Sequence, residues 1–252
     1  MSVISIINSK GGVGKTSSTL EIASCLGLTG ERVLVVDLDG QADCTKVLSK
    51  GKRPSNGIYD ALIGEEEIGS LAHRSGFENV YYIAADRRLG GFEAAIANRL
   101  EREMILSEVI EPVRKMFKYI VFDCPPDMNM LTTNALVASD FYICPCDLSR
   151  FSNEAISAIK HHADLIRKRL NPKLKCLGTF LVRVEKMNSF ASRLGMEGLK
   201  KLVGDDLFDI SIPATSKIPE AHLKNSTLTH MFPDNKVAIA YRQITQNIIE
   251  RS

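Results

Sequence analysis

A short run near the start of the chain combines glycines with a lysine and a hydroxyl group, in the order Ser9-Lys10-Gly11-Gly12-Val13-Gly14-Lys15-Thr16. A glycine loop between a buried strand and a helix lets backbone N–H groups point at phosphate oxygens, and the helix N-terminus adds positive potential. At the end of such a loop, the Lys15 ammonium is expected on the β- and γ-phosphates and the Thr16 hydroxyl on magnesium. The run therefore predicts a site for ATP and Mg²⁺.

The entrance of this loop departs from the standard phosphate-binding pattern, because Ser9 replaces the usual glycine and a second lysine, Lys10, follows it. Lys10 lies too far along the backbone to duplicate Lys15, so we expect its side chain to reach outward, toward a nucleotide bound by a partner subunit. The predicted nucleotide contacts of the loop are Lys10, Gly11, Gly12, Val13, Gly14, Lys15, Thr16 and Ser17.

Three aspartates stand at the ends of apolar runs that predict strands, which is where an open α/β sheet places residues for metal and water. Asp37 and Asp39 follow Val33-Leu34-Val35-Val36, and Asp123 follows Tyr119-Ile120-Val121-Phe122. Asp123 is the predicted magnesium acid, while Asp39 lies in a loop that responds to the γ-phosphate and orients the attacking water. The predicted metal site comprises Thr16, Asp39 and Asp123, and the catalytic roles fall to Lys10 and Asp39.

Short runs rich in Val and Ile alternate with longer helical patterns, as in a parallel sheet buried on both faces. We predict strands at Val3–Ile7, Arg32–Asp37, Val80–Ala84, Tyr119–Asp123, Phe141–Cys144 and Leu177–Val184, with a weaker one at Phe208–Ile212. Helices are expected at about 16–29, 92–117, 131–138, 151–170, 190–203 and 236–250. This order predicts an α/β fold: a single P-loop NTPase domain over residues 1–252, with a mostly parallel twisted sheet flanked by helices.

The composition is that of an ordinary soluble globular protein, with 25% charged and 44% hydrophobic residues among 252. The first residues lack a basic segment and run straight into the glycine loop, and no apolar stretch is long enough to span a bilayer. Residues 151–252 hold sixteen Lys and Arg against ten Asp and Glu, whereas residues 1–150 hold sixteen against twenty. This asymmetry indicates either a polyanionic partner or a solvated basic surface.

Six cysteines are spread along the chain without the dense spacing of a secreted disulfide framework, which favours reduced thiols in a cytosol. Only Cys144-Pro145-Cys146 forms a pair, and no second Cys or His pair at zinc-finger spacing accompanies it. This pair could bind a metal ion or could lie at the end of a buried strand, and the buried strand is favoured.

Four motifs make the chain resemble the ParA/MinD family of deviant Walker ATPases, closest to its ParA partition branch. They are KGGVGKT at 10–16, VLVVDLDGQAD at 33–43, FDCPPDMNMLTTNALVASD at 122–140 and IPATSKIPEA at 212–221. The first is shared by the whole superfamily, and the third and fourth are specific to the ParA branch. The resemblance extends nearly from end to end of the sequence.

The resemblance implies a role for several of these residues. Lys10 corresponds to the signature lysine that contacts the partner's nucleotide, Asp39 to the switch-loop aspartate and Asp123 to the Walker B acid. Pro213 and Thr215 are expected beside the adenine. The chain departs from the family pattern in having Gly40 where proline is usual and Thr215 where asparagine is usual, so the adenine contacts are the least direct inference.

The family also implies partners. ATP is expected to join a homodimer that binds double-stranded DNA without sequence preference, and a ParB-like or other adaptor protein is expected to stimulate hydrolysis. Lys217 matches a family DNA contact by motif position, and the full set of predicted DNA-binding residues is Lys186, Arg193, Lys200, Lys201, Lys217 and Lys224. We expect no N-terminal helix-turn-helix domain, no operator binding and no membrane, and a cytoplasmic protein that associates with the nucleoid when ATP is bound.

Other members of the superfamily provide competing interpretations. A MinD-like membrane switch needs a basic amphipathic helix, whereas residues 241–252 predict a packed terminal helix. An iron–sulfur reductase needs cysteines that bridge two subunits, and amide synthases or dethiobiotin synthetase need a pocket for a small acid. The cargo of a ParA-like engine, whether plasmid, chromosome region or protein assembly, is not specified by these motifs.

Overall fold

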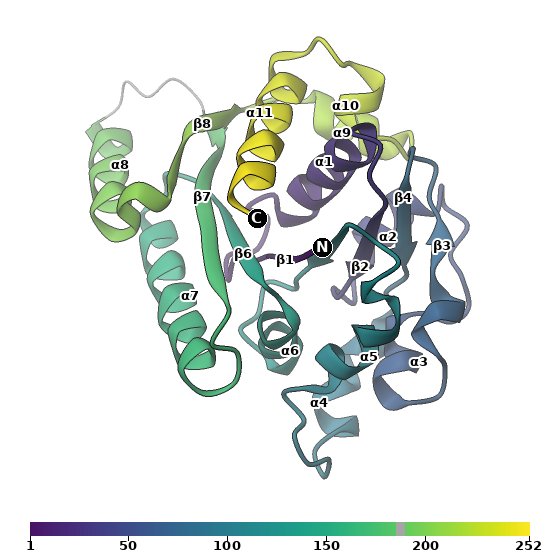
Figure 1. Cartoon of the computed structure of the whole chain (residues 1–252). Coiled ribbons are helices and arrows are strands. Elements are labelled where there is room, and N and C mark those ends of the chain that lie inside the picture. Colours follow the sequence, from purple (N-terminus) through teal and green to yellow (C-terminus); the bar gives the residue numbers. More distant parts are fainter. Residues whose placement is uncertain (185–189) are drawn as a thin grey trace.

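The computed structural model describes residues 1–184 and 190–252, and within this part eight strands form one sheet (Figure 1). The strand order is β3-β4-β2-β5-β1-β6-β7-β8, and every neighbouring pair is parallel except the edge pair β3–β4. The strands are β1 (Ser2–Ile6), β2 (Val33–Asp37), β3 (His73–Arg74), β4 (Val80–Ile83), β5 (Tyr119–Asp123), β6 (Phe141–Cys146), β7 (Lys175–Val184) and β8 (Leu207–Pro213).

Helices cover both faces of this sheet, with α1 and α11 on one side and α5 and α6 on the other (Figure 1). The helices are α1 (Lys15–Leu28), α2 (Asp43–Leu48), α3 (Ile58–Ile63), α4 (Phe92–Ala95), α5 (Ile105–Arg114), α6 (Met130–Ala138), α7 (Arg150–Arg169), α8 (Phe190–Val203), α9 (Lys217–Leu223), α10 (Leu228–Met231) and α11 (Lys236–Arg251). The described residues also contain three 3₁₀ turns: η1 (Ile68–Leu71), η2 (Arg87–Gly91) and η3 (Gly204–Asp206).

The burial of the central strands explains why their sequences are almost entirely apolar. All residues of β1, β2 and β5 are buried, since side chains alternate between two helical layers. Ile4 packs in the core beneath α1 and α11, whereas its neighbour Val3 packs in the core beneath α5 and α6. The predicted α/β class with a mostly parallel sheet flanked by helices is confirmed.

The register brings the predicted carboxylates to one edge of the sheet. Asp37 is paired with Asp123 across β2 and β5, and Ile6 is paired with Asp123 across β1 and β5. Because parallel strands end at the same edge, both aspartates lie beside the loop that follows β1.

The predicted helix at 92–117 is wrong as a single element, because α4 and α5 are separated by turns. The side chain of Asn134, on α6, accepts a hydrogen bond from Leu106 N at 3.0 Å and donates one to Arg102 O at 2.9 Å. This contact fixes the start of α5 from outside the segment. Leu100, between the two helices, is 93% exposed, so this part of the segment buries no apolar stripe.

A buried carboxylate ties α1 to the C-terminal part of the chain. Glu21 is fully buried and accepts hydrogen bonds from Leu228 N at 2.7 Å, from Thr229 N at 3.0 Å and from Thr229 Oγ1 at 2.6 Å. Burial raises the pKa of Glu21 above its ordinary value, and these donors oppose that rise. Tyr241 on α11 adds a second link, with its hydroxyl 3.2 Å from Ser18 Oγ.

The Cys144-Pro145-Cys146 run lies inside β6, and both thiols are free and buried. Burial raises the pKa of Cys146 to about 12, which keeps it a thiol at neutral pH. The buried-strand interpretation is therefore confirmed. Among the described residues, no helix is both long enough and apolar enough to cross a bilayer.

Candidate active site

The glycine loop joins β1 to α1 and leaves its inner face open. Gly12 and Gly14 have φ of 69° and 92°, a left-handed conformation that favours glycine. A Cβ built on Gly11 or Gly12 would meet no atom within 4 Å, whereas Val13 is buried and anchors the loop in the core. No side chain caps the N-terminus of α1, so its first N–H groups are available to an anion.

Lys15 is the buried cation of this loop. Its side chain is at the first turn of α1, the residue is only 6% exposed, and Nζ donates to Lys10 O at 3.4 Å. Burial lowers the pKa of Lys15 from its ordinary value, and the negative charge of Asp123 is the main opposing influence. An ammonium held in this way is suited to an incoming anion, which would restore its charged form.

Asp37 and Asp123 form a buried acidic pair behind the loop. Asp37 accepts hydrogen bonds from Asp39 N at 3.0 Å, Thr45 N at 2.8 Å and Thr45 Oγ1 at 2.7 Å. Asp123 accepts one from Thr19 Oγ1 at 2.9 Å through Oδ1, while its Oδ2 is buried and has no partner in the described part of the chain. Burial, followed by the mutual repulsion of the pair, raises the pKa of Asp123.

This unsatisfied oxygen fits a magnesium ion. Mg²⁺ is typically held by one or two carboxylates, with substrate phosphates and waters completing its octahedron. Asp123 supplies the carboxylate, and the Thr16 hydroxyl, which also lowers the pKa of Asp123, lies on the same side. No group of three or more His, Cys, Asp or Glu side chains forms a ready-made metal site in the described chain, and Asp39 as a magnesium ligand stays a prediction.

The raised pKa of Asp123 predicts how stability depends on pH. In the folded protein the Asp123 carboxyl releases its proton at a higher pH than in the unfolded chain, so its contribution to stability is fully present below the unfolded pKa and is lost as pH rises through the folded one. With EDTA present, we expect the unfolding midpoint to fall between pH 6 and pH 8.5, and to fall less in Asp123→Asn. Each kcal/mol by which the substitution reduces this loss of stability corresponds to about 2–4 °C in the unfolding midpoint. Parallel curves for the two proteins in scanning calorimetry would contradict this.

Asp39 lies on the loop after β2, at the rim of the site. Its Oδ1 accepts a hydrogen bond from Gln41 N at 2.9 Å, and the loop borders a cavity of about 540 Å³ whose opposite wall includes Asp127 and Asn129. A Cβ on Gly40 would make only ordinary contact, 3.5 Å from Asp86 O, so no close approach demands glycine there. Gly40 therefore adds backbone freedom to the loop.

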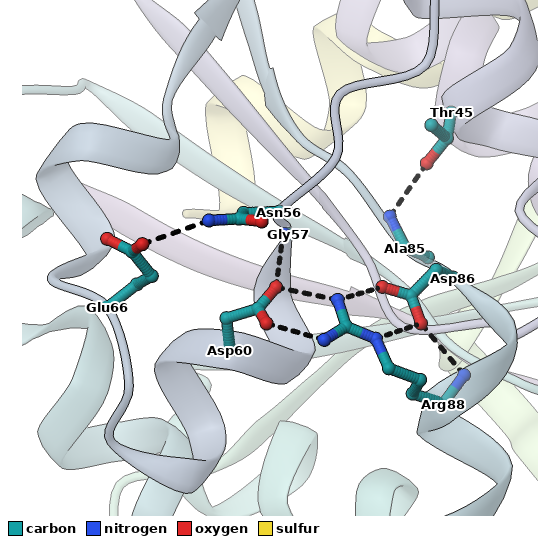
Figure 2. A network of polar contacts seen from close by, with 8 residues as sticks. All are labelled: Thr45, Asn56, Gly57, Asp60, Glu66, Ala85, Asp86 and Arg88. Carbon is teal, nitrogen blue, oxygen red and sulfur yellow. Dashed lines mark hydrogen bonds and ion pairs between the residues drawn. The ribbon is translucent and has the colours of Figure 1, made fainter.

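A polar network that sequence reasoning missed supports this loop (Figure 2). Thr45 Oγ1, which donates to Asp37, also accepts from Ala85 N at 2.9 Å and so connects the end of β2 to the segment after β4. In that segment, Arg88 forms a bidentate ion pair with Asp60 at 2.6 and 2.8 Å and contacts Asp86 at 2.7 Å. The network holds η2 in place against Gly40.

The side chain of Lys10 folds back on its own chain instead of extending freely. Its Nζ pairs with Asp147 and donates to Ser149 Oγ at 2.8 Å, just beyond the end of β6. Burial alone would raise the pKa of Asp147, but hydrogen bonds from Lys10 and Ser152 hold it well below its usual range. Sequence reasoning did not find Asp147, although its place directly after a strand is the signal that identified Asp39 and Asp123.

A second cavity, of about 630 Å³, opens beside the start of α1. Thr16, Ser17, Pro213 and Thr215 all line it, so the predicted base contacts share one cavity with the start of α1. Thr215 Oγ1 accepts from Lys217 N at 3.1 Å. Residues that sequence reasoning missed complete the lining: Asp43, Lys46, Val47, Val182, Arg183, Ile212, Ile218, Pro219, His222, Leu223, Asn225 and Tyr241.

The described members of the predicted DNA-binding set come from two separate helices. Arg193, Lys200 and Lys201 are exposed on α8, which lies apart from α9 (Figure 1). Lys217 and Lys224 both contact Glu220, at 2.7 and 3.3 Å, so their charge is partly neutralised. Lys186 lies outside the described residues.

Comparisons with known proteins agree with the motifs. A family model, AAA_31, described as AAA domain, matches residues 1–176. Sporulation initiation inhibitor protein Soj of Bacillus subtilis (strain 168) is 30% identical over 247 residues, covering 98% of this chain and 97% of Soj. The chain belongs to the ParA/MinD family of P-loop ATPases. Chromosome partitioning protein ParA of Caulobacter vibrioides (strain NA1000 / CB15N) is 31% identical over 222 residues, covering 87% and 83%.

A solved structure of a different enzyme has the same fold as this chain. The cobyrinic acid a,c-diamide synthase of Mycobacterium smegmatis, crystallised with ADP and magnesium, has a TM-score of 0.85 and 25% identity, and the match covers 99% of this chain and 94% of the synthase. The family model and the curated relatives thus confirm the family predicted from the four motifs, and this structure with bound ADP and magnesium shares the fold.

Proposed function

We propose that this ParA/MinD-family protein binds ATP with Mg²⁺, dimerises on it, binds double-stranded DNA without sequence preference and hydrolyses ATP to position a cargo. The observation that carries the proposal is the grouping of charges at the glycine loop: the carboxylates of Asp123 and Asp39 both act on the buried ammonium of Lys15. Thr16 lies within reach of Asp123, and Lys10 lies at the rim. Relatives whose names state chromosome partitioning support the choice of cargo movement over other ATPase functions.

The residues around the glycine loop are suited to ATP with Mg²⁺. The loop N–H groups and Lys15 would receive the phosphates, Thr16 and Asp123 would hold Mg²⁺, and the cavity beside Pro213 and Thr215 would receive the base. Bound magnesium supplies neutralisation of phosphate charge. Asp39 orients the attacking water from the loop after β2, and Asp37 fixes the base of that loop through Asp39 N.

Dimerisation involves Lys10. To reach the nucleotide of a partner subunit, its ammonium must leave Asp147 and Ser149, so the intrachain ion pair competes with the dimer contact. The exchange replaces one carboxylate with a more highly charged phosphate, which favours the dimer once ATP is bound. A ParB-like or other adaptor then stimulates hydrolysis, and the protein alternates between the nucleoid and the cytoplasm.

We expect Asp39→Ala to slow ATP hydrolysis by about 100-fold or more, because water positioning acts in the transition state. ATP binding and dimerisation depend on other groups and should persist, so the variant stays on DNA. Phosphate release in the presence of DNA and adaptor measures the first effect, and light scattering with ATP measures the second. Normal turnover in the variant would remove Asp39 from the mechanism.

A MinD-like membrane switch is the second candidate within the family. The apolar face of α11 is buried, with Tyr241, Ile244 and Ile248 in the core beneath α1, so in this fold it is not presented to a lipid surface. Sedimentation with anionic liposomes and ATP separates the two functions: recovery of the protein with liposomes but not with DNA would favour the membrane switch over DNA binding.

A further inference from the structure

The turn η2 borders the same cavity as the Asp39 loop. Leu89 and Gly90 of η2 line this cavity of about 540 Å³ together with Asp39 and Gly40. The backbone of the turn also lies against the loop, since a Cβ on Gly40 would be 3.5 Å from Asp86 O and 3.9 Å from Gly90 N. A contact that fixes η2 therefore restricts the movement of the Asp39 loop on this side.

Arg88 holds the start of this turn on α3. Its guanidinium lies between two carboxyl groups (Figure 2). It donates to both oxygens of Asp60, at 2.6 and 2.8 Å, and to both oxygens of Asp86, at 3.0 and 2.7 Å. The guanidinium carbon also lies 5.0 Å from the centre of the Tyr59 ring. Because Asp60 belongs to α3 and Asp86 caps η2, one planar side chain joins two elements.

The ion pair with Asp60 differs from an ordinary surface contact. The Asp60 side chain is only 5% exposed, and it also accepts a hydrogen bond from Gly57 N at 2.7 Å. Burial alone would raise the pKa of Asp60, but the hydrogen bonds from Arg88 and Gly57 N lower it below its ordinary value. The carboxylate therefore stays charged at neutral pH and restrains Arg88 more strongly than a solvated carboxylate would.

A second connection reaches the Asp39 loop from the end of β2. Thr45 Oγ1 accepts a hydrogen bond from Ala85 N at 2.9 Å and donates one to Asp37 at 2.7 Å. Asp37 in turn accepts one from Asp39 N at 3.0 Å. Ala85 directly precedes the η2 carboxylate that Arg88 holds. A displacement of this segment would therefore reach Asp39 both through these hydrogen bonds and through the packing of η2.

We propose that Arg88 is a positioning residue for ATP hydrolysis, because it joins α3 to η2 and so holds the Asp39 carboxylate in place. The inference rests on the proposed function, in which Asp39 orients the attacking water. The hydrogen bonds and the ring contact of Arg88 go to Asp60, Asp86 and Tyr59, which lie outside the glycine loop and the base cavity. Arg88 therefore acts on the rate and not on ATP affinity, since a displacement of about 1 Å in an orienting group slows a reaction by up to about 100-fold.

The first test is Arg88→Lys, which keeps a positive charge beside Asp60 but loses the planar fork that binds two carboxyl groups at once. Phosphate release at saturating ATP and magnesium should slow about tenfold, while the affinity for a slowly hydrolysed ATP analogue stays within about twofold of the wild type. An equal loss of affinity and of turnover, or wild-type turnover, would overturn the proposal.

The unfolding midpoint separates positioning from a merely structural role. Arg88→Gln leaves the buried Asp60 carboxylate without its ion pair, so both the midpoint and the turnover should fall. Arg88→Lys should recover most of the midpoint but not the turnover. Recovery of both together would mean that Arg88 only stabilises the fold. Arg167→Lys, at an ion-paired and exposed arginine on α7, is the matched control and should keep the wild-type turnover and midpoint.

A double-mutant cycle tests whether Arg88 acts through Asp39. In the Asp39→Ala background, Arg88→Lys should slow hydrolysis no further, because the group that it positions is absent. The same loss of turnover in both backgrounds would overturn the inference and leave Asp39 in its proposed role. Normal turnover in Asp39→Ala alone would overturn the proposed role of Asp39, and this inference with it.

Discussion

Lys15→Ala should abolish ATP binding and every property that depends on it. The ammonium is the buried cation inside the loop, and it lies too deep for solvent to replace it. Loss of a charge-assisted contact in such a site costs about 3 kcal/mol or more, which is about 100-fold in affinity. Isothermal titration with a slowly hydrolysed ATP analogue and magnesium measures the effect directly.

The Lys15→Ala variant is expected to remain folded. Without the neighbouring positive charge, the pKa of Asp123 should rise further, so its carboxyl group stays protonated and leaves no unpaired buried charge. Circular dichroism and an unfolding midpoint near the wild-type value establish that the fold is intact. A folded Lys15→Ala protein with wild-type ATP affinity would show that the glycine loop is not the phosphate site.

Lys10→Ala should separate ATP binding from dimerisation. The side chain contributes nothing to its own phosphate cradle, because its Nζ is held by Asp147 and Ser149. ATP should bind with nearly wild-type affinity, while the dimer that wild-type protein forms with ATP should be lost, since a phosphate contact of about 2–3 kcal/mol is removed at each of two symmetric sites. Light scattering with ATP measures the mass.

Asp147→Asn is the companion to this variant. It keeps the shape of the side chain but removes the charge that holds Lys10, so the dimer should form at lower protein concentration than in the wild type. A normal dimer in Lys10→Ala would contradict the role given to the lysine. A weaker dimer in Asp147→Asn would instead mean that Asp147 positions Lys10 for its partner.

The sequence was sufficient for the sheet and for the strand-end carboxylates because both follow from local patterns. Buried parallel strands appear as continuous apolar runs, and a strand that ends in Asp37 or Asp123 places that carboxyl at a known edge. The glycine loop is similarly local. These features depend on residues that are adjacent in the chain.

Features made by distant residues were not predictable in this way. The break between α4 and α5 depends on Asn134, and the restraint on Lys10 depends on Asp147. Periodicity carries no information about such contacts, because each requires the completed fold. The division of the predicted DNA residues between α8 and α9 has the same origin.

The buried carboxylate of Glu21 has a consequence for synthesis on the ribosome. Its hydrogen-bond donors, Leu228 and Thr229, are separated from it by 207 and 208 positions. Until those residues emerge, a carboxylate on α1 faces the interior without partners, which is costly for a charged group. The helix that begins with Lys15 therefore completes its packing only after residues 228 and 229 have left the ribosome, and nascent chains that stop before them are expected to lack a competent ATP site.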